Sequence, residues 1–204
     1  MKKIILAPIA LLALTLVAFT PVADPLKPGD ALPNADWKMT DVSGKSLSLK
    51  EAMKENGLLV MFSCNTCPYV VKNQTRTIEA MNVARKYQVG VAILNSNEGR
   101  RTSDDSFEEM KEYAKSQGYT DYAWYLVDEG SKQADAFGAN RTPECFLFNK
   151  DGKLVYHGAI DDNPNDENAV TRKHLRVAME ELSGGKEVTV KESRSVGCTI
   201  KRKS

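Results

Sequence analysis

Two cysteines, Cys64 and Cys67, follow directly after an apolar run from Leu58 to Phe62. The run is typical of a buried strand, and a segment of helical character begins near Pro68. Two thiols at this spacing can close a disulfide with little chain movement. A helix N-terminus at this point would favour the thiolate of the first, which is the form that attacks disulfides and peroxides. The pattern therefore predicts redox chemistry, with a structural disulfide or half of a metal site as the alternatives.

The two remaining cysteines, Cys145 and Cys198, lie far along the chain. Cys145 opens an apolar run, where a small buried hydrophobic residue is the simplest interpretation and a third redox thiol behind the site is the alternative. Cys198 lies in a polar tail. It could be a resolving thiol, an intermolecular thiol, or a residue that pins the tail to the body, for instance through Cys145.

The segments around these cysteines alternate between strand-like and helix-like patterns. We expect a hairpin over 37–40 and 45–49, a short helix capped by Ser48, strands over 58–62, 89–94 and 124–127, helices over 68–87, 103–118 and 131–137, an antiparallel hairpin over 145–148 and 154–156, and a helix over 168–182. This order argues for an α/β sandwich with a mixed sheet.

The first residues have the pattern of a secretory signal. Lys2 and Lys3 precede a nearly continuous apolar stretch over 4–19, and small residues follow up to Ala23. A retained membrane anchor is the alternative, although the stretch is marginal for a span and is broken by Pro8. Export would place the protein in the periplasm or outside the cell, where disulfides persist. We therefore expect a signal peptide over 1–23, one domain over 24–185 and a basic tail over 186–204.

The overall charge excludes one class of partner. The 204 residues carry 28 Lys and Arg against 27 Asp and Glu, which gives a formal net charge of +1. Such a balance offers no basic surface for nucleic acid, and no internal repeat is visible.

Five stretches of the sequence together resemble a known superfamily. They are Phe62-Ser63-Cys64-Asn65-Thr66-Cys67-Pro68-Tyr69-Val70, Asn95-Ser96-Asn97, Arg141-Thr142-Pro143-Glu144, Ile160-Asp161-Asp162-Asn163 and Gly197-Cys198-Thr199-Ile200-Lys201. Over roughly residues 27 to 202 the chain resembles the thioredoxin superfamily in its redoxin branch, the thiol-specific antioxidant and alkyl hydroperoxide reductase group. The resemblance implies a thioredoxin-like sandwich, with a central mixed β-sheet flanked by helices.

The resemblance also implies roles for four residues. Cys64 matches the attacking, more exposed thiol of the pair, and Cys67 matches the resolving thiol. Pro143 matches the cis-proline that faces the disulfide, and the backbone of Thr142 matches the position that pairs with the substrate chain. The implied mechanism is thiolate attack on a disulfide, a mixed disulfide, and resolution by the second thiol.

The sequence departs from the superfamily pattern at several positions. Ser63 and Asn65-Thr66 replace the usual neighbours of the cysteines, and Leu58 stands where thioredoxin has a buried acid. Peroxiredoxins attack peroxide with the cysteine of a Thr-x-x-Cys pattern, which would make Cys67 the peroxidatic thiol. Arg141 is then a candidate to polarise the peroxide.

We therefore predict an exported thiol-disulfide oxidoreductase that acts through Cys64 and Cys67 on protein thiols and disulfides, with a thiol protein as electron donor or acceptor. A thiol-dependent peroxidase is the first alternative. The second is a module that binds copper or zinc through both cysteines and one histidine, His157 or His174, without turnover. The main prediction includes no cofactor, no nucleic acid and no stable membrane span after signal cleavage.

Overall fold

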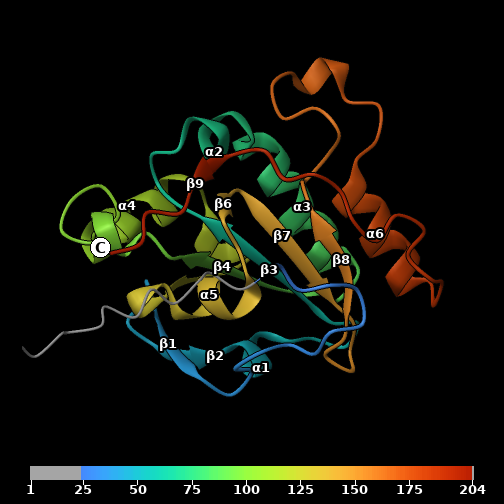
Figure 1. Ribbon diagram of the computed structural model, residues 1–204, viewed down its shortest axis with the longest axis horizontal. Coiled ribbons are helices and arrows are strands. Elements are labelled where there is room, and N and C mark those ends of the chain that lie inside the picture. Colours follow the sequence, from blue (N-terminus) through green and yellow to red (C-terminus); the bar gives the residue numbers. More distant parts are fainter. Residues whose placement is uncertain (1–23, 204) are drawn as a thin grey trace, which may run out of the picture.

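The computed structural model describes residues 24–203, so the predicted signal peptide lies outside the described residues (Figure 1). Seven strands form the central sheet of this part, in the order β2-β1-β5-β4-β3-β7-β8. Their bounds are β1 (Lys38–Asp41), β2 (Ser46–Ser48), β3 (Leu58–Ser63), β4 (Gly90–Asn95), β5 (Trp124–Val127), β7 (Glu144–Phe148) and β8 (Leu154–Gly158). The sheet is mixed, because β3 is parallel to β4 and antiparallel to β7.

Strand β3 lies inside this sheet and is buried along its whole length. Its continuous apolar sequence fits a strand that is covered on both faces. The register places Phe62 beside Leu94 of β4 and beside Glu144 of β7. Because β7 runs antiparallel to β3, the start of β7 meets the end of β3. The segment that follows β3 and the segment that precedes β7 are therefore brought to the same edge of the sheet.

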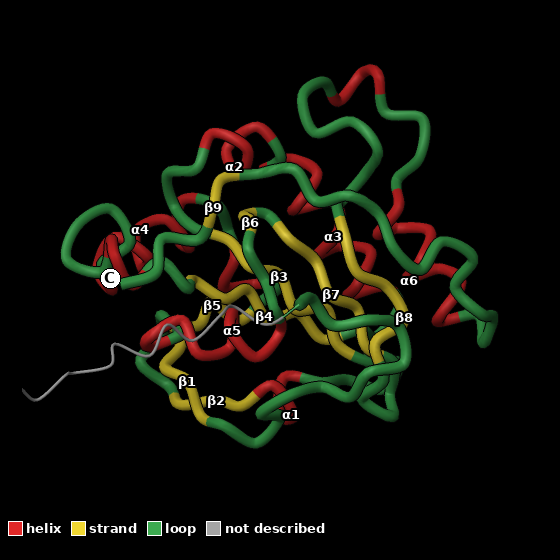
Figure 2. Tube along the Cα trace, in the orientation of Figure 1, coloured by secondary structure: helices red, strands yellow, loops and turns green. Residues whose placement is uncertain are grey.

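Helices cover both faces of the sheet (Figures 1 and 2). One face packs against α3 (Gln74–Lys86), α4 (Phe107–Ser116) and α6 (His174–Ser183). The other packs against α1 (Leu49–Ala52) and α5 (Lys132–Phe137). Helix α2 (Pro68–Lys72) follows β3 and leads into α3. Within residues 24–203, no helix has both the length and the apolar character needed to cross a membrane.

Most predicted elements are confirmed, and three boundaries differ. The helix expected over 68–87 divides at Asn73 into α2 and α3. Helix α4 begins after Ser106, whose side chain accepts the N–H of Glu109, rather than at residue 103 or 104. The helix expected from residue 168 begins only at His174. Asp162 explains the last difference, because it accepts the backbone N–H of Thr171 and keeps the preceding segment in a loop.

The C-terminal segment packs along the body of the protein (Figure 2). Residues near 192 run beside β8, where His157 donates its N–H to Lys191 and accepts the N–H of Ser193. Gly158 permits this approach, since a Cβ there would lie 2.3 Å from the Ser193 hydroxyl oxygen. Val188 is buried in the core. The sequence predicts a basic tail over 186–204, and the described part of that tail is built into the fold.

The chain then crosses to the edge of the sheet near the end of β3. There β9 (Cys198–Thr199) pairs antiparallel with β6 (Arg141–Thr142), the short strand just before β7. The two strands form a separate small sheet. This pairing carries Cys198 to the point where the segments after β3 and before β7 meet.

Candidate active site

The cysteine pair lies in the turn between β3 and α2. Strand β3 ends at Ser63, and Cys67 is the N-cap residue of α2. A residue before proline is disfavoured in the α region, so the helix cannot begin before Pro68. Proline itself suits the first helical position, because its missing N–H needs no partner there. Cys67 is thus the N-cap residue, and Cys64 faces the start of the helix as predicted. There, burial raises the pKa of the Cys64 thiol and outweighs the backbone N–H groups of Cys67 and Thr66, which lower it.

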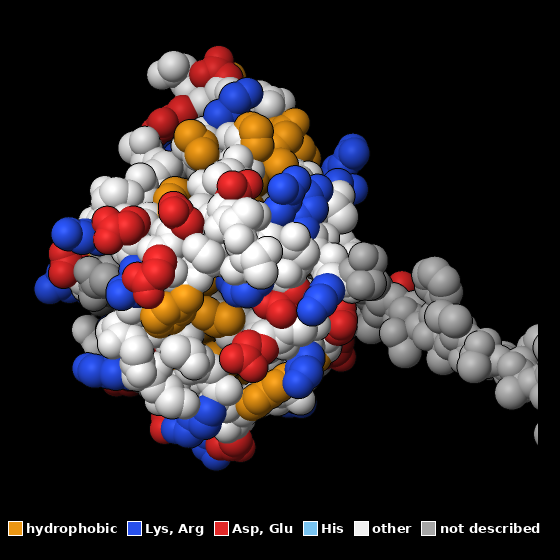
Figure 3. Space-filling model, turned by 90° about the vertical axis from the view of Figure 1, so that its left-hand side faces the viewer, with side chains coloured by type: hydrophobic (Ala, Val, Ile, Leu, Met, Phe, Trp, Pro, Cys, Tyr) orange, Lys and Arg blue, Asp and Glu red, His pale blue; other side chains and the backbone are white. Residues whose placement is uncertain are grey.

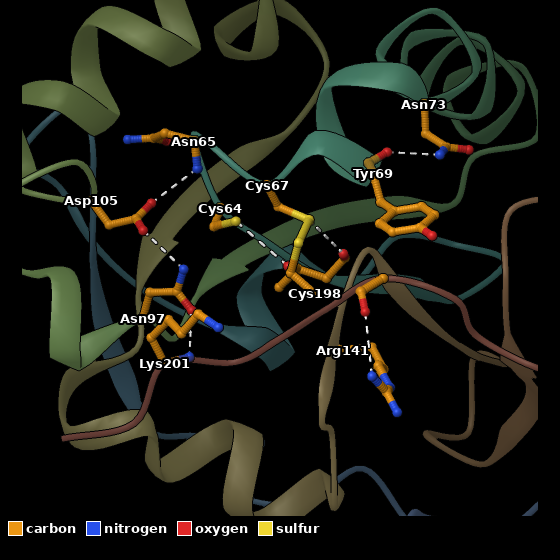
Figure 4. The surroundings of a disulfide bond; sticks show 12 residues. Cys64, Asn65, Cys67, Tyr69, Asn73, Asn97, Asp105, Arg141, Cys198 and Lys201 are labelled. Atoms are coloured by element: carbon orange, nitrogen blue, oxygen red, sulfur yellow. Dashed lines mark hydrogen bonds between the residues drawn. A yellow bond between two sulfur atoms is a disulfide. The ribbon is translucent and has the colours of Figure 1, made fainter. Parts of the chain in front are cut away.

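The structure joins Cys67 to Cys198 in a disulfide across 131 residues of sequence, with 6.0 Å between their Cα atoms. Cys64 and Cys145 are free. Figure 4 shows the free Cys64 sulfur on one side of this disulfide. The interpretation of Cys198 as a residue that pins the tail is confirmed, but its partner is Cys67 and the suggested bond to Cys145 is wrong. The tail crosses the end of β3, whereas Cys145 lies within β7 with its side chain in the core.

Thr142 and Pro143 complete the cluster of predicted site residues. The Thr142–Pro143 peptide bond is cis. The Cys64 sulfur lies 3.5 Å from the Thr142 hydroxyl oxygen, and the Cys67 sulfur lies 3.3 Å from the Thr142 carbonyl oxygen. A single residue thus contacts both sulfurs of the Cys-x-x-Cys segment. The sheet register explains this, because it brings the start of β7 to the end of β3.

Both cysteines of the segment are buried, with exposed fractions of 2% for Cys64 and 4% for Cys67. The expectation that Cys64 is the more exposed thiol is wrong. Burial raises the pKa of the Cys64 thiol, and the negative charge of Asp105 raises it further, while the hydrogen bond with Thr142 lowers it. Desolvation is the largest of these effects, so Cys64 is held as a neutral thiol at neutral pH.

A buried polar network fixes the turn between the two cysteines. The Asp105 carboxylate accepts the backbone N–H of Asn65 at 2.9 Å and side-chain N–H groups of Asn95 at 2.7 Å and Asn97 at 2.9 Å. Tyr125 donates its hydroxyl to the Asn65 side-chain oxygen at 2.7 Å. Sequence reasoning singled out Asn95-Ser96-Asn97 only as a matching stretch and missed Asp105. No local pattern marks Asp105, because the contact that fixes the turn joins it to Asn65, 40 residues away.

Glu144 supports the segment that carries Thr142. One of its carboxylate oxygens accepts the backbone N–H groups of Asn140 at 2.8 Å and Arg141 at 2.9 Å. The other lies 2.8 Å from Nε2 of His157, whose ring stacks on Phe146. Among residues 24–203, no group of three or more His, Cys, Asp or Glu side chains is arranged to hold a metal ion.

Arg141 is directed at the tail and not at the sulfurs. Its Nη1 donates to the Gly197 carbonyl oxygen at 3.4 Å, and its guanidinium is exposed to solvent. Figure 4 shows this side chain pointing away from the disulfide. In this arrangement Arg141 does not polarise a peroxide at Cys67.

Cys145 belongs to the core of the protein. It is fully buried opposite Met61 of β3, and burial raises the pKa of its thiol. The interpretation of Cys145 as a small buried hydrophobic residue is confirmed.

Comparison with known proteins identifies the family of this chain. The family model of Redoxin matches residues 27–174. The chain belongs to the Redoxin family. Its thioredoxin-like fold is that of the redoxin branch of the thioredoxin superfamily, as the sequence predicts. No curated protein sequence matches this Redoxin chain.

Solved structures resemble this Redoxin-family protein over most of its length. A hypothetical protein from Sinorhizobium meliloti 1021 is 30% identical with a TM-score of 0.80, covering 89% of this chain and 97% of that one. An uncharacterized conserved protein from Geobacillus kaustophilus is 34% identical with a TM-score of 0.79, covering 86% and 92%. Peroxidoxin BcpB from Mycobacterium tuberculosis is 14% identical with a TM-score of 0.52, covering 64% and 83%, and this likeness shows the fold alone.

Proposed function

We propose that this Redoxin-family protein is a thiol-disulfide oxidoreductase that exchanges disulfides with thiol proteins through Cys64 and Cys67. The observation that supports this most directly is a disulfide on Cys67 beside a free thiol, Cys64, with both sulfurs in contact with Thr142. A disulfide exchanges by attack of a neighbouring thiolate on one of its sulfurs. We expect Cys67 to exchange its disulfide bond with Cys198 for one with Cys64, which is the free thiol beside it.

The exchange transfers two electrons between this chain and its partner. When a disulfide forms between Cys64 and Cys67, each sulfur loses its proton and the pair loses two electrons. The partner's disulfide takes up the two electrons and becomes two thiols. The reverse direction reduces the Cys64–Cys67 disulfide at the expense of a partner dithiol. Membership of the Redoxin family supports redox chemistry of this kind.

The surface beside Cys67 supports a protein as the partner. Val71 on α2 is 56% exposed, and only Trp37 is another exposed large hydrophobic residue in the described range. Pro68 is also exposed, one residue after Cys67. On the face drawn in Figure 3, charges of both signs are mixed with small apolar patches. Pro68 and Val71 are three residues apart and therefore neighbours on the surface of α2, so together they offer a partner protein a small apolar contact near Cys67.

Export is part of the proposal. Lys2 and Lys3 followed by an apolar stretch support a secretory signal over residues 1–23. We propose a periplasmic or secreted mature protein, whose disulfides would persist in that compartment. Fractionation of cells that produce the full chain, with detection of the shortened mature form, tests this proposal. Retention of the full-length chain in the cytoplasm would refute it.

The exchange reaction is tested by reduction of insulin disulfides with a thiol donor. We expect Cys67→Ser to abolish activity above background and Cys64→Ser to lower it strongly. Cys145→Ala is the matched control, since it removes a buried thiol outside the site, and it should retain activity. The proposal fails if the double variant Cys64→Ser/Cys67→Ser reduces insulin as fast as the native protein.

One observation favours a second candidate, a thiol-dependent peroxidase. A disulfide between Cys67 and Cys198 is the product expected if Cys67 first reacted with peroxide. The Cys67 thiolate would attack one peroxide oxygen, the O–O bond would break, and Cys67 would become a sulfenic acid while hydroxide left as water. The Cys198 thiol would then displace a second water and form the disulfide.

Timed oxidation by hydrogen peroxide separates the two candidates. Arg141 points away from the sulfurs, so we expect oxidation of Cys67 to be slow compared with disulfide exchange. Fast peroxide oxidation that persists in Cys64→Ser would favour the peroxidase.

A further inference from the structure

The C-terminal segment occupies the edge of β6 beside the cysteine pair. Thr142 pairs with Cys198, and Arg141 pairs with Thr199. Gly197 allows this close approach, because a Cβ at that position would lie 2.1 Å from the Thr142 carbonyl oxygen. The main-chain groups of β6 are therefore used by a segment of the same chain. An extended polypeptide from outside could not pair with this edge while the segment is in place.

Contacts after Cys198 hold the segment independently of the disulfide. The Ile200 side chain is 3% exposed in the core beneath α5, and its N–H donates to the Asn140 carbonyl oxygen at 3.1 Å. Arg202 donates to the Asp135 carboxylate at 2.7 Å and to the Ala139 carbonyl oxygen at 2.8 Å.

Lys201 adds two backbone contacts with the loop that follows β4. Its N–H donates to the Asn97 side-chain oxygen at 2.8 Å, and its carbonyl oxygen accepts the N–H of Gly99 at 2.7 Å. A Cβ on Gly99 would lie 2.9 Å from the Arg202 carbonyl oxygen, so a glycine is needed for this contact. None of these contacts requires the Cys67–Cys198 bond. They keep Cys198 next to Cys67 after reduction, at a high effective concentration.

The three cysteines differ in access from outside. Cys64 and Cys67 are buried, whereas Cys198 is only partly buried. An attacking thiol must reach a sulfur along its disulfide bond, so the accessible sulfur reacts first. In this protein that sulfur belongs to Cys198.

We propose that Cys198 is the thiol through which partner proteins exchange electrons with Cys67, while residues 197–202 fill the strand edge that a partner's main chain would otherwise use. This inference rests on the proposed exchange function and adds a third cysteine to it. Cys198 faces the partner, Cys67 is the central sulfur, and Cys64 is the inner thiol.

This exchange through three cysteines, which we call the relay, has three steps. In the reduced protein, the Cys198 thiolate attacks a partner disulfide, forms a mixed disulfide and releases one partner thiolate. The Cys67 thiolate then attacks the Cys198 sulfur and releases the second partner thiolate, which leaves the Cys67–Cys198 bond of this structure. Finally the Cys64 thiolate attacks Cys67, and Cys198 leaves as a thiolate that takes a proton. Two electrons have passed from the protein to the partner, and Cys198 is free again.

Glutathione disulfide is the first probe of this order. It is added to the reduced protein, and the sulfur that first carries glutathione is identified by peptide mass spectrometry. In Cys67→Ser, which stops the relay after its first step, we expect the adduct on Cys198 to form about tenfold or more faster than the adduct on Cys64, because access controls the rate. Faster modification of Cys64 would overturn the proposal.

Insulin is the second probe and tests the occupied strand edge. We expect Cys198→Ser to slow insulin reduction about tenfold or more. Insulin must then react directly with the buried Cys64 or Cys67, which residues 197–202 still cover. Adding Ile200→Ala should loosen the segment and recover part of the rate. Val188→Ala in the same background is the matched control, since it truncates an equally buried residue of the tail that does not hold β9.

Two further outcomes separate this inference from the proposed function. If Cys198→Ser reduces insulin at the native rate, Cys198 is not the entry thiol, and the relay is refuted while exchange through Cys64 and Cys67 stands. If the native protein exchanges with neither probe, the proposed function and the relay both fail.

Discussion

Replacing Gly197 by alanine tests the contact that holds the C-terminal segment on β6. The new Cβ would lie 2.1 Å from the carbonyl oxygen of Thr142 and 2.7 Å from its carbonyl carbon. Non-bonded carbon atoms are attracted at separations of about 3.5–4.0 Å and repel each other strongly at much shorter range. The segment must therefore move away from Thr142 by about 1 Å. It cannot do so and keep its hydrogen bonds with β6, which are well formed only up to about 3.2 Å between nitrogen and oxygen.

The size of the effect follows from the contacts that are lost. Each hydrogen bond contributes about 0.5–1.5 kcal/mol net, so the loss of two costs about 1–3 kcal/mol. The equilibrium constant for holding Cys198 beside Cys67 therefore falls by about 5-fold to 150-fold. The equilibrium constant for forming the Cys67–Cys198 disulfide should fall by the same factor, because it depends on the effective concentration of the two thiols.

The assay is a redox titration in glutathione buffers, in which free thiols are alkylated and counted by mass spectrometry. Cys64→Ser is used as the background, so that Cys67 pairs only with Cys198. Gly184→Ala is the matched control, because its Cβ would meet no atom closer than 3.3 Å and Gly184 lies at the end of α6, away from the β6–β9 pair (Figure 1). An unchanged equilibrium constant in Gly197→Ala would refute the argument that this contact seats the tail.

Three further predictions concern single side chains. Burial raises the pKa of Cys64, so its alkylation in the reduced protein should accelerate only at a pH above the usual thiol midpoint; a midpoint at or below that of free cysteine would contradict this. In the native protein the Arg76 guanidinium lies 2.7 Å from the buried Asp161 carboxylate. Arg76→Ala leaves that carboxylate without its partner, so it should lower the free energy of unfolding by about 3–5 kcal/mol in urea titrations. Cys145→Val should change the insulin rate little, and a large loss would show that this thiol takes part in the exchange.

The sequence predicted the elements that depend on local pattern. The apolar run after Leu58 identified the central strand, because a strand covered on both faces needs apolar residues at successive positions. Ser48 and Glu51 formed the expected helix start, since each binds the backbone of the other. The antiparallel hairpin expected over 145–148 and 154–156 formed as β7 and β8, which a turn at Asp151-Gly152 connects. Helix boundaries were less certain where a loop contact, such as that of Asp162 with Thr171, competes with the helix.

The residues of the candidate site were also readable, but their arrangement was not. Sequence and resemblance together named Cys64, Cys67, Thr142 and Pro143, and the sheet register brings all four to one edge. The burial of Cys64 could not be foreseen. Its exposure is set by neighbours that come from distant parts of the chain.

By itself, then, the sequence determined the order of the strands along the chain and the Cys-x-x-Cys segment, because these depend on neighbours a few residues apart. Its five matching stretches, spread over the chain, indicated the redox family. Only the tertiary structure decided that Cys67 bonds to Cys198 and that Asp105 holds the turn between the cysteines. Both contacts depend on where a remote segment crosses the edge of the sheet. That position is set by packing of the whole core, for which no local spacing gives a signal.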